Sequence, residues 1–277
     1  MKISIVTISY NQAEFLEKTI LSVIEQDYDK IEYIVVDPGS TDGSRKIIDR
    51  YRSKIDKVIF EHDEGPSDGL NKGFAYATGQ IYGFLNSDDF FLPHAVRNVA
   101  RFFSQNVHID VLSGHAIVVN EEERMLRKFY SDKYSLRNVA YGASTIVQQS
   151  TFFKSKMFGI VGGFNKRNNV AWDGEIFIDM ALSGANFCVL NSFLSAFRLH
   201  KNSITSSMKL ADSYSRYKKD MFYKIIKREP KQKDKILRFK YKALQYKNNP
   251  RSFYERLLHG PIAGHYNNNY KFNKKTF

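Results

Sequence analysis

The first 89 residues alternate between short apolar runs and segments with helical periodicity, and this alternation constrains the fold more than any other feature. The apolar runs cover residues 3–8, 31–37, 58–60 and 81–85, and turn residues bound them. Such runs are typical of buried strands, and strands separated by helices of 10–15 residues form parallel sheets through right-handed crossovers. The sequence therefore predicts an α/β fold in which helices flank a mostly parallel central sheet.

Beyond residue 89 the alternation becomes less regular. The pattern predicts helices over residues 93–104 and from Trp172 onwards. Strands are predicted over residues 111–113, 116–119, 147–153, 187–190 and 193–199. After His200 the sequence is helical in pattern, basic and aromatic. We place a boundary near residue 205, which separates a domain of residues 1–205 from a basic, mainly helical extension of residues 206–277.

Charge is distributed unevenly along a chain whose formal net charge is +13. From residue 201 onwards there are 20 Lys and Arg against 5 Asp and Glu, which leaves 22 basic and 24 acidic residues before it. Such asymmetry indicates an acidic partner for the extension, either nucleic acid or an anionic lipid surface. The single cysteine, Cys188, excludes an internal disulfide and fits a reducing compartment. No apolar stretch approaches the ~20 residues of a membrane span, so we expect a cytoplasmic protein.

Acidic residues follow three of the predicted strands. They are Asp37, Asp63, and the adjacent pair Asp88 and Asp89. Because ligands bind at the carboxyl ends of strands in open α/β sheets, these side chains mark a candidate site. Paired carboxylates suit Mg²⁺ or Mn²⁺, which share their remaining positions with substrate phosphates, although Asp88 or Asp89 could instead cap the next helix. Neither a Gly-x-Gly-x-x-Gly turn nor a P-loop is present, which argues against a Rossmann dehydrogenase and a P-loop NTPase.

Six motifs in order resemble family 2 glycosyltransferases of the GT-A fold, of the inverting type that builds bacterial cell-surface polysaccharides. They are TISYNQ (7–12), VVDPGSTDGS (35–44), DGLNKG (68–73) running to NSDD (86–89), GGF (162–164), WDGE (172–175), and RLH (198–200) with Ser203 and Thr205. The set covers about residues 1–205. The resemblance implies a GT-A domain and strengthens the interpretation of Asp88 and Asp89 as a metal-binding motif.

The resemblance also implies roles for individual residues. A nucleotide-sugar donor would contact Thr7, Tyr10, Asp37, Gly39, Ser40, Asp68, Asn71, Lys72, Asn86, Ser87 and Asp88. Asp37 would accept a hydrogen bond from the imide nitrogen of the base, unless it caps the following helix. Lys72 could equally be a solvated helix residue. The divalent ion, Mn²⁺ or Mg²⁺, would be held by Asp88, Asp89 and His200, although a lone histidine at a strand end is often ordinary packing.

Asp173 would be the general base that deprotonates the acceptor hydroxyl, with Trp172 and Glu175 in the acceptor region. Because Asp173 and Glu175 are two residues apart, the motif alone does not fix which carboxylate faces the acceptor. The sequence departs from the family pattern at Asn86, where an aspartate is common, at Pro38, which replaces a commonly acidic residue, and at Gln148, where relatives often carry histidine.

These residue types fit an inverting transfer. The expected reaction moves a hexose or N-acetylhexosamine from a nucleotide-diphosphate donor, expected to be a UDP-sugar, to a hydroxyl of a glycan or lipid-linked glycan. A positioned carboxylate contributes roughly 10²–10⁴-fold as a general base, and a divalent ion acts as a Lewis acid on the leaving group. A catalytically inactive binding module on the same fold is an alternative, but the presence of Asp37, Asp88, Asp89 and Asp173 argues against it.

The basic extension allows two interpretations. A basic amphipathic helix lies naturally on an anionic membrane, which predicts peripheral binding at the inner face of the cell membrane. Alternatively, the aromatic residues of the extension pack against the catalytic domain. We expect no nucleic-acid partner, because the extension shows no zinc-ligand spacing, no RNP-like motif and no helix-turn-helix, and such a partner would leave the acidic strand ends unexplained.

Overall fold

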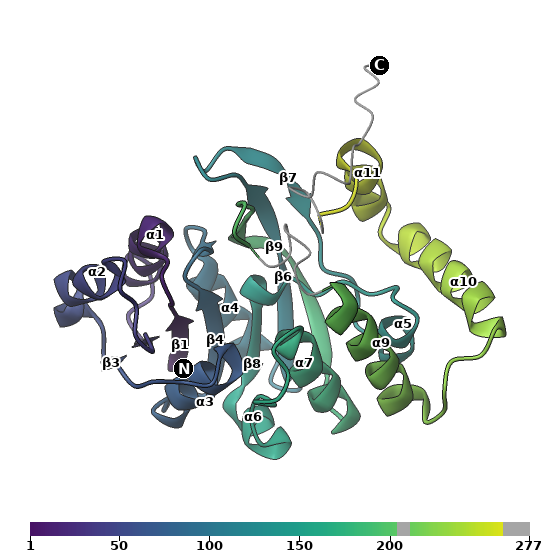
Figure 1. Cartoon of the computed structure of the whole chain (residues 1–277), viewed down its shortest axis with the longest axis horizontal. Helices are drawn as coiled ribbons and strands as arrows, with labels where there is room; N and C mark the ends of the chain where they lie inside the picture. The colour runs from purple at the N-terminus through teal and green to yellow at the C-terminus, as the bar shows by residue number, and fades with distance from the viewer. Residues whose placement is uncertain (204–210, 263–277) are drawn as a thin grey trace.

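A computed structural model describes residues 1–203 and 211–262 of the chain (Figure 1). In this part, nine strands form one sheet of order β3-β2-β1-β4-β8-β6-β9-β5, with β7 paired to β6. The strands are β1 (Ile3–Ile8), β2 (Ile31–Val36), β3 (Lys57–Ile59), β4 (Ile81–Asn86), β5 (Phe90–Phe91), β6 (Val111–Val119), β7 (Met125–Phe129), β8 (Thr151–Lys154) and β9 (Phe187–Arg198). The predicted α/β class is therefore confirmed.

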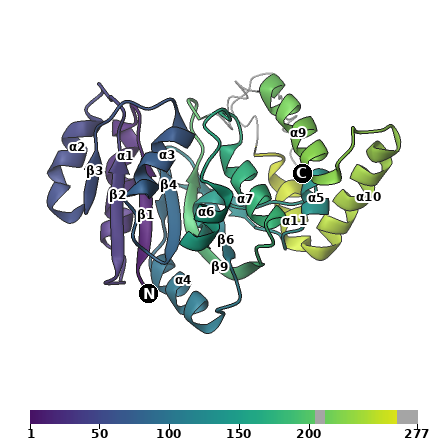
Figure 2. The ribbon, with the colours of Figure 1, turned by 90° about the horizontal axis from the view of Figure 1, so that it is seen from below.

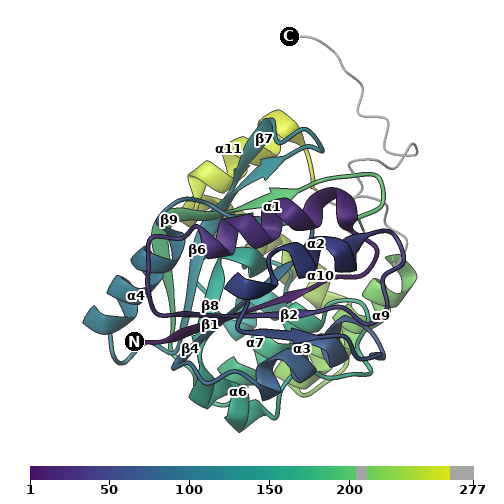
Figure 3. The same cartoon turned by 90° about the vertical axis from the view of Figure 1, so that its left-hand side faces the viewer.

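Helices cover both faces of the sheet (Figure 3). They are α1 (Ala13–Ile24), α2 (Ser44–Arg50), α3 (Pro66–Ala75), α4 (Ala95–Gln105), α5 (Leu136–Ala140), α6 (Ser155–Val161), α7 (Trp172–Leu182), α9 (Ala211–Ile226), α10 (Lys233–Asn248) and α11 (Pro250–His259), with short 3₁₀ helices η1 (Arg52–Lys54) and η2 (Gln148–Ser150). One apolar core packs α1, α2 and α4 against the sheet, and a second packs α3, α6 and α7 against the opposite face. The amphipathic periodicity of the sequence is satisfied by these two cores.

The parallel half of the sheet sets the position of the candidate site. β1 lies between β2 and β4 and is parallel to both. In this register Ile8 is paired with Val36 on one side and with Asn86 on the other. The three strands therefore end at the same level, and the residues that follow them meet at one edge.

The second half of the sheet differs from the sequence prediction. β6 and β9 are each one continuous strand where two were predicted, and residues 148–150 form η2 where a strand was predicted. Gly114 lies within β6 at a shift in register, and a Cβ there would lie 2.5 Å from Leu194 Cδ1 of β9. Glycine in a strand often marks a bulge or a close approach of this kind. Gly114 therefore does not end the strand, as the sequence analysis expected, but leaves room for Leu194 of the neighbouring strand.

The C-terminal extension is helical, as predicted, and it packs against the α/β domain (Figure 2). Phe222 of α9 is fully buried against Tyr141, and the Tyr141 ring stacks on Tyr241 of α10 at 4.7 Å between centroids. Asp234 of α10 accepts a hydrogen bond from Tyr141 Oη at 3.0 Å and forms an ion pair with Arg228. The predicted boundary near residue 205 falls outside the described residues and stays a prediction.

Asp132 fastens the extension to the domain. Its buried carboxylate accepts hydrogen bonds from Thr145 N at 2.9 Å, from Asn249 Nδ2 at 2.7 Å and from Gln245 Nε2. We expect Asp132→Ala to destabilise the protein, because each buried donor left without a partner costs about 1–3 kcal/mol. A lower urea midpoint than that of the exposed control Asp220→Ala would support this role. Equal midpoints would show that Asp132 does not hold the extension.

Candidate active site

Asp37 follows β2 at the shared edge and is completely buried. Its Oδ1 accepts hydrogen bonds from Gly39 N at 3.1 Å, Ser40 N at 2.8 Å and Arg45 Nε at 3.0 Å. Its Oδ2 is buried and has no hydrogen-bond partner in the described structure. Because a buried acceptor without a donor is costly, Oδ2 is suited to an N–H group of a ligand. Helix α2 begins at Ser44, so Asp37 is not its N-cap.

Two loops are held together beside Asp37. Asn11 N donates to Ser40 Oγ at 2.8 Å, and Thr41 N donates to Asn11 Oδ1 at 2.8 Å. The neighbouring Tyr10 side chain is 61% exposed at this edge, as a residue that contacts a base requires. Thr7 differs from the prediction, because its buried hydroxyl accepts from Tyr33 Oη at 3.1 Å inside the sheet. Arg45 was not predicted from the sequence, since only the fold brings it to Asp37.

Asp88 and His200 meet at the end of β4. Their Oδ2 and Nε2 atoms are 3.0 Å apart, and the nearly buried His200 ring lies 4.8 Å from the Phe15 ring centroid. These residues are 112 positions apart in the chain. The expected proximity of Asp88 and His200 is therefore present in the structure.

Asp89 has a different environment from Asp88. It is 1% exposed, its Oδ1 accepts from Arg198 N at 2.9 Å, and its Oδ2 accepts from Gln149 Nε2 at 3.0 Å. Burial, together with the charge of Asp88, raises the pKa of Asp89 well above its ordinary value. Because both oxygens are occupied inside the protein, this conformation favours a positioning role for Asp89 over the predicted metal ligation.

Arg198 supports the same loop, a role that the sequence analysis did not predict. Its side chain is 2% exposed, and its Nε donates to Asp88 O at 2.9 Å. Its Nη1 donates to Glu121 O at 3.0 Å, and its Nη2 pairs with Glu123 at 3.2 Å. Arg198 thus ties the acidic loop to the turn between β6 and β7, a link that the RLH motif alone could not reveal.

Within residues 1–203 and 211–262, no three His, Cys, Asp or Glu side chains are grouped to enclose a metal. The Asp88–His200 pair nevertheless offers a hard oxygen and an imidazole nitrogen beside the strand ends. This donor set fits Mn²⁺ or Mg²⁺, which commonly leave positions for water and substrate phosphate oxygens. Thr205 of the last motif lies outside the described residues.

The three residues of α3 that were predicted to bind the donor, Asp68, Asn71 and Lys72, make contacts within the protein. The Asn71 amide pairs with the Phe164 backbone, donating to its carbonyl and accepting from its N–H, each at 2.8 Å. Gly163 has φ +84° and would place a Cβ 2.7 Å from Asn71 Oδ1. Asp68 lies 2.5 Å from Lys166 Nζ, and Lys72 donates to the His62 carbonyl. Asn71 therefore fastens the GGF motif to α3, which gives it a structural role.

Asn86 and Ser87 complete the acidic loop. Asn86 Oδ1 is buried and has no hydrogen-bond partner in the described structure, whereas the Ser87 carbonyl accepts from Thr19 Oγ1 at 2.8 Å. The Asn86 amide oxygen is thus a second buried acceptor at this edge. The Ser87 contact holds the loop on α1.

The two carboxylates at the start of α7 have different environments. Glu175 is buried and accepts hydrogen bonds from Asn165, from Asn168 at 2.6 Å and from Lys224 at 3.3 Å. Asp173 is partly buried, and its carboxylate accepts from the backbone N–H groups of Gly174 and of Asp173 itself, with no partner among the described side chains. Burial raises the pKa of Asp173 above its ordinary value. A carboxylate with a raised pKa and no side-chain partner suits a general base, so the geometry favours Asp173 over Glu175.

Helix α9 forms a wall beside Asp173 that the sequence analysis did not assign to the site. A Cβ on Gly174 would lie 3.0 Å from Tyr217 Oη, and the Tyr214 and Tyr217 rings stack at 6.0 Å between centroids. Burial and the charge of Asp173 raise the pKa of Tyr214. The spacing of the two tyrosines was visible in the sequence, but their partner was not. Trp172 packs against the Phe84 ring at 5.6 Å and so belongs to the core.

Comparison with protein-family models identifies one match. The model described as glycosyl transferase family 2 covers residues 4–161. An uncharacterized glycosyltransferase of Nostoc sp. is 33% identical over 145 residues, which are 49% of this chain and 45% of that protein. The UDP-Glc:alpha-D-GlcNAc-diphosphoundecaprenol beta-1,3-glucosyltransferase WfgD of Escherichia coli is 27% identical over 74% of this chain and 80% of its own length. The chain thus spans less than half of the Nostoc relative.

Solved structures agree with the architecture. TarS 1–349 of S. aureus in complex with UDP-GlcNAc matches with a TM-score of 0.66 at 18% identity, covering 93% of this chain and 73% of that TarS 1–349 chain. The mannosyltransferase PcManGT of Pyrobaculum calidifontis in complex with GDP-Man and Mn²⁺ has a TM-score of 0.63, 18% identity and the same two coverages. At this identity the likeness concerns the fold, and it confirms the expected GT-A architecture.

Proposed function

Because the chain belongs to glycosyl transferase family 2, we propose that it is an inverting enzyme that transfers a hexose or N-acetylhexosamine from a UDP-sugar to a hydroxyl of a glycan or lipid-linked glycan. The observation that carries this proposal is the convergence of Asp37 and the Asp88–His200 pair at one sheet edge. The name of WfgD, which specifies a UDP-glucose donor and a diphosphoundecaprenol-linked acceptor, supports the same class of substrates.

The donor side of the proposal rests on Asp37 and Tyr10. The unpartnered Asp37 Oδ2 would accept the imide N–H of uracil, while its Oδ1 stays bonded to Ser40 N and Arg45. The exposed Tyr10 ring would lie against the base. UDP is proposed as the nucleotide because an imide N–H complements a lone carboxylate oxygen, and TarS has been solved with UDP-GlcNAc.

The transfer step is assigned to Asp173. Its carboxylate would take the proton of the acceptor hydroxyl while the acceptor oxygen bonds to the anomeric carbon and the bond to the diphosphate breaks, which inverts the configuration. Tyr214 and Tyr217 would shape the acceptor side of this step. Asp88 and His200 would hold the divalent ion, and Asp89 and Arg198 would fix the loop that carries Asp88. When bound, the ion supplies Lewis acidity to the departing diphosphate.

The experiment that tests this function is thermal unfolding with Mn²⁺ and UDP, GDP or CDP, followed by incubation with UDP-sugars and an acceptor. A ligand at 100 times its Kd stabilises the folded state by about 2.7 kcal/mol, so UDP with Mn²⁺ should raise the Tm clearly. No stabilisation by any of these nucleotides would contradict the proposal. Nucleotide binding without transfer to any tested acceptor would instead support an inactive module.

We further propose that the outer face of α10 and α11 contacts an anionic membrane at the cytoplasmic side. Apolar side chains there are strongly exposed, with Ile236 at 74%, Phe239 at 79% and Leu257 at 68%. Exposed basic residues accompany them, namely Lys235, Arg238, Lys240 and Arg256. Each well-placed basic residue contributes about 1 kcal/mol at an anionic surface. In the described ranges, no helix has the length and apolarity needed to cross a bilayer.

Introducing negative charges on α11 tests the membrane contact. We expect Leu257→Glu with Leu258→Glu to abolish most cosedimentation with vesicles that contain phosphatidylserine, because two exposed apolar side chains that would enter the membrane are replaced by negative charges. The control is Ile160→Glu on α6, which changes a side chain of similar exposure, 53%, outside α10 and α11. Equal vesicle binding of the α11 variant and the control would contradict the contact.

A further inference from the structure

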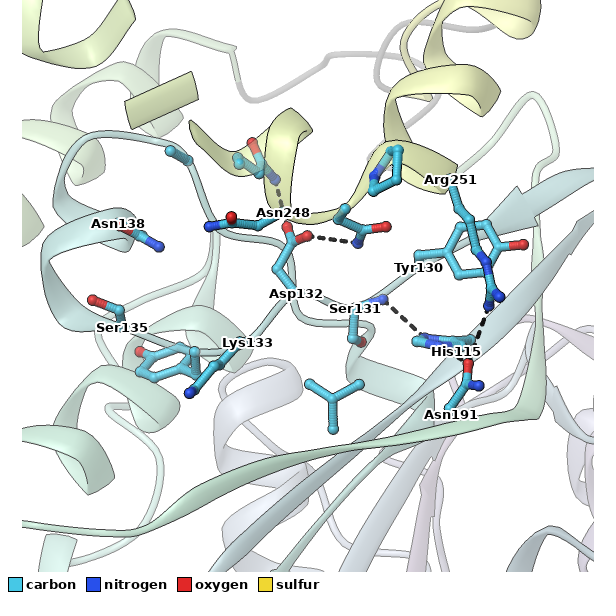
Figure 4. Close-up of a pocket in the computed structure, with 16 residues that line it drawn as sticks. His115, Tyr130, Ser131, Asp132, Lys133, Ser135, Asn138, Asn191, Asn248 and Arg251 are labelled. Carbon is cyan, nitrogen blue, oxygen red and sulfur yellow. Dashed lines mark hydrogen bonds between the residues drawn. The ribbon is translucent and has the colours of Figure 1, made fainter. Parts of the chain in front are cut away.

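A second cleft lies where the extension meets the sheet, and it shares no residue with the donor, metal and base positions assigned above (Figure 4). It has a volume of about 500 Å³, within the range of small-molecule sites. Its walls come from β6 and β9, from the segment of residues 130–135, and from residues 245–251 of α10 and α11. The cleft therefore exists only because the extension is docked on the domain.

Among the described residues that line this cleft, the one carboxylate, that of Asp132, already has hydrogen-bond donors. Asp132 accepts from Thr145 N, Gln245 Nε2 and Asn249 Nδ2, and the last two donors belong to the extension. Three of the roughly four acceptor sites of this carboxylate are therefore taken by protein donors, which leaves little room for ligand hydroxyls. Asp132 thus builds the cleft and is not its ligand-binding group.

A chain of hydrogen bonds orients one wall. Ser131 N donates to His115 Nδ1 at 3.2 Å, so Nε2 carries the proton and donates to Asn191 Oδ1 at 3.3 Å. Burial lowers the pKa of His115, which keeps the ring neutral near pH 7. Arg251 Nη1 also donates to Asn191 Oδ1, at 3.4 Å. Because this oxygen is used, the amide nitrogen of Asn191 is left as a donor.

The remaining polar groups of the cleft favour an anion. Lys133 and Arg251 both line it, and neither forms an ion pair with any residue in the ranges 1–203 and 211–262. Together with the Asp132 carboxylate, whose three donors are uncharged, these two cationic side chains leave the described lining of the cleft with one excess positive charge. Asn138, Asn191 and Asn248 add amide groups that can donate to and accept from hydroxyls.

From this arrangement we propose that the cleft binds an acidic saccharide of the acceptor glycan, whose carboxylate or phosphate pairs with Lys133 or with Arg251, at opposite sides of the cleft (Figure 4), and whose hydroxyls meet the asparagine amides. The inference rests on the proposed transferase function, because it assigns the ligand to the acceptor substrate. A second binding subsite for the acceptor, away from Asp173, would let the enzyme select acidic glycans without contacts at the reacting hydroxyl.

The test is calorimetric titration of the full chain with four probes. They are a tetrasaccharide of alternating glucuronic acid and N-acetylglucosamine, the neutral N-acetylglucosamine tetramer, glucose 6-phosphate and inorganic phosphate. We expect at least one acidic saccharide to bind about tenfold or more tightly than the neutral tetramer and inorganic phosphate, since hydrogen bonds to charged groups are the stronger ones. Which acidic saccharide binds distinguishes a carboxylate from a phosphate ligand.

The matched variants are Lys133→Ala with Arg251→Ala in the cleft and Lys240→Ala on the exposed face of α10. We expect the cleft variant to lose about tenfold or more in affinity and Lys240→Ala to change little. Failure of both acidic saccharides to bind, equal affinity for the neutral tetramer or for phosphate alone, or equal losses in both variants would overturn the inference. Stabilisation by UDP with Mn²⁺, measured on the same variants, reports on the proposed function independently of the cleft.

Discussion

Replacement of Asp173 by Asn is expected to lower the rate of sugar transfer about 10²–10⁴-fold while UDP binding is retained. The amide keeps the size of the side chain but cannot take a proton from the acceptor hydroxyl. The carboxylate accepts from the backbone N–H groups of Gly174 and of Asp173 itself, and the amide oxygen of an asparagine can accept the same bonds. The measurement is initial-rate kinetics with saturating UDP-sugar, together with stabilisation by UDP and Mn²⁺.

The same variant makes a prediction about stability. Burial raises the pKa of Asp173, so the folded state binds the proton more tightly than the unfolded state. Its contribution to stability is therefore present at low pH and is lost as the pH rises from the unfolded pKa through the raised folded pKa. At pH 7 the charged carboxylate costs stability, and Asp173→Asn should unfold at the same Tm or a higher one. A higher Tm on removal of a charged side chain is typical of active-site carboxylates, which are kept for activity at a cost in stability.

The pH dependence and a matched variant complete the test of Asp173. The wild-type transfer rate should rise with pH through a pKa above the ordinary aspartate value of about 4. Glu175→Gln serves as the control, because Glu175 binds Asn168 and Lys224 and is expected to affect stability more than the rate per folded molecule. Full transfer activity in folded Asp173→Asn would remove Asp173 as the base.

Asp88→Asn is expected to abolish the Mn²⁺-dependent part of UDP binding. Removing a residue that supports a metal ligand costs roughly 10–100-fold in metal affinity, so loss of a ligand charge should cost about 100-fold or more. The Asp88 carboxylate is only partly buried and pairs with His200 at 3.0 Å, so the fold should survive the change. The measurement is the Tm shift with UDP in the presence and absence of Mn²⁺.

Asp89→Ala provides the contrasting variant. The buried Asp89 carboxylate accepts from Arg198 N and Gln149 Nε2, and each donor left without a partner costs about 1–3 kcal/mol. We therefore expect a lower Tm for Asp89→Ala, with Mn²⁺-dependent UDP binding still detectable at low temperature. If instead Asp89→Ala lost the Mn²⁺ response and Asp88→Asn kept it, the assignment of the metal to Asp88 would be reversed.

The sequence by itself determined the parallel half of the sheet and the edge at which the candidate site lies. Buried strands and amphipathic helices are encoded within short windows, so the runs before Asp37 and Asp88 predicted both the strands and their shared edge. The order of the six motifs was sufficient to indicate the family. The helical character of the extension was likewise local information.

Tertiary structure alone decided what the side chains at that edge do. Asn71 meets the Phe164 backbone across 93 positions, and His200 meets Asp88 across 112. Asp89 faces inward and Asp88 does not, although the two are adjacent and chemically identical. Tyr217 reaches Gly174 only because the extension packs on the domain. Such contacts depend on how distant elements pack, and the periodicity of a short stretch of sequence carries no record of its partner.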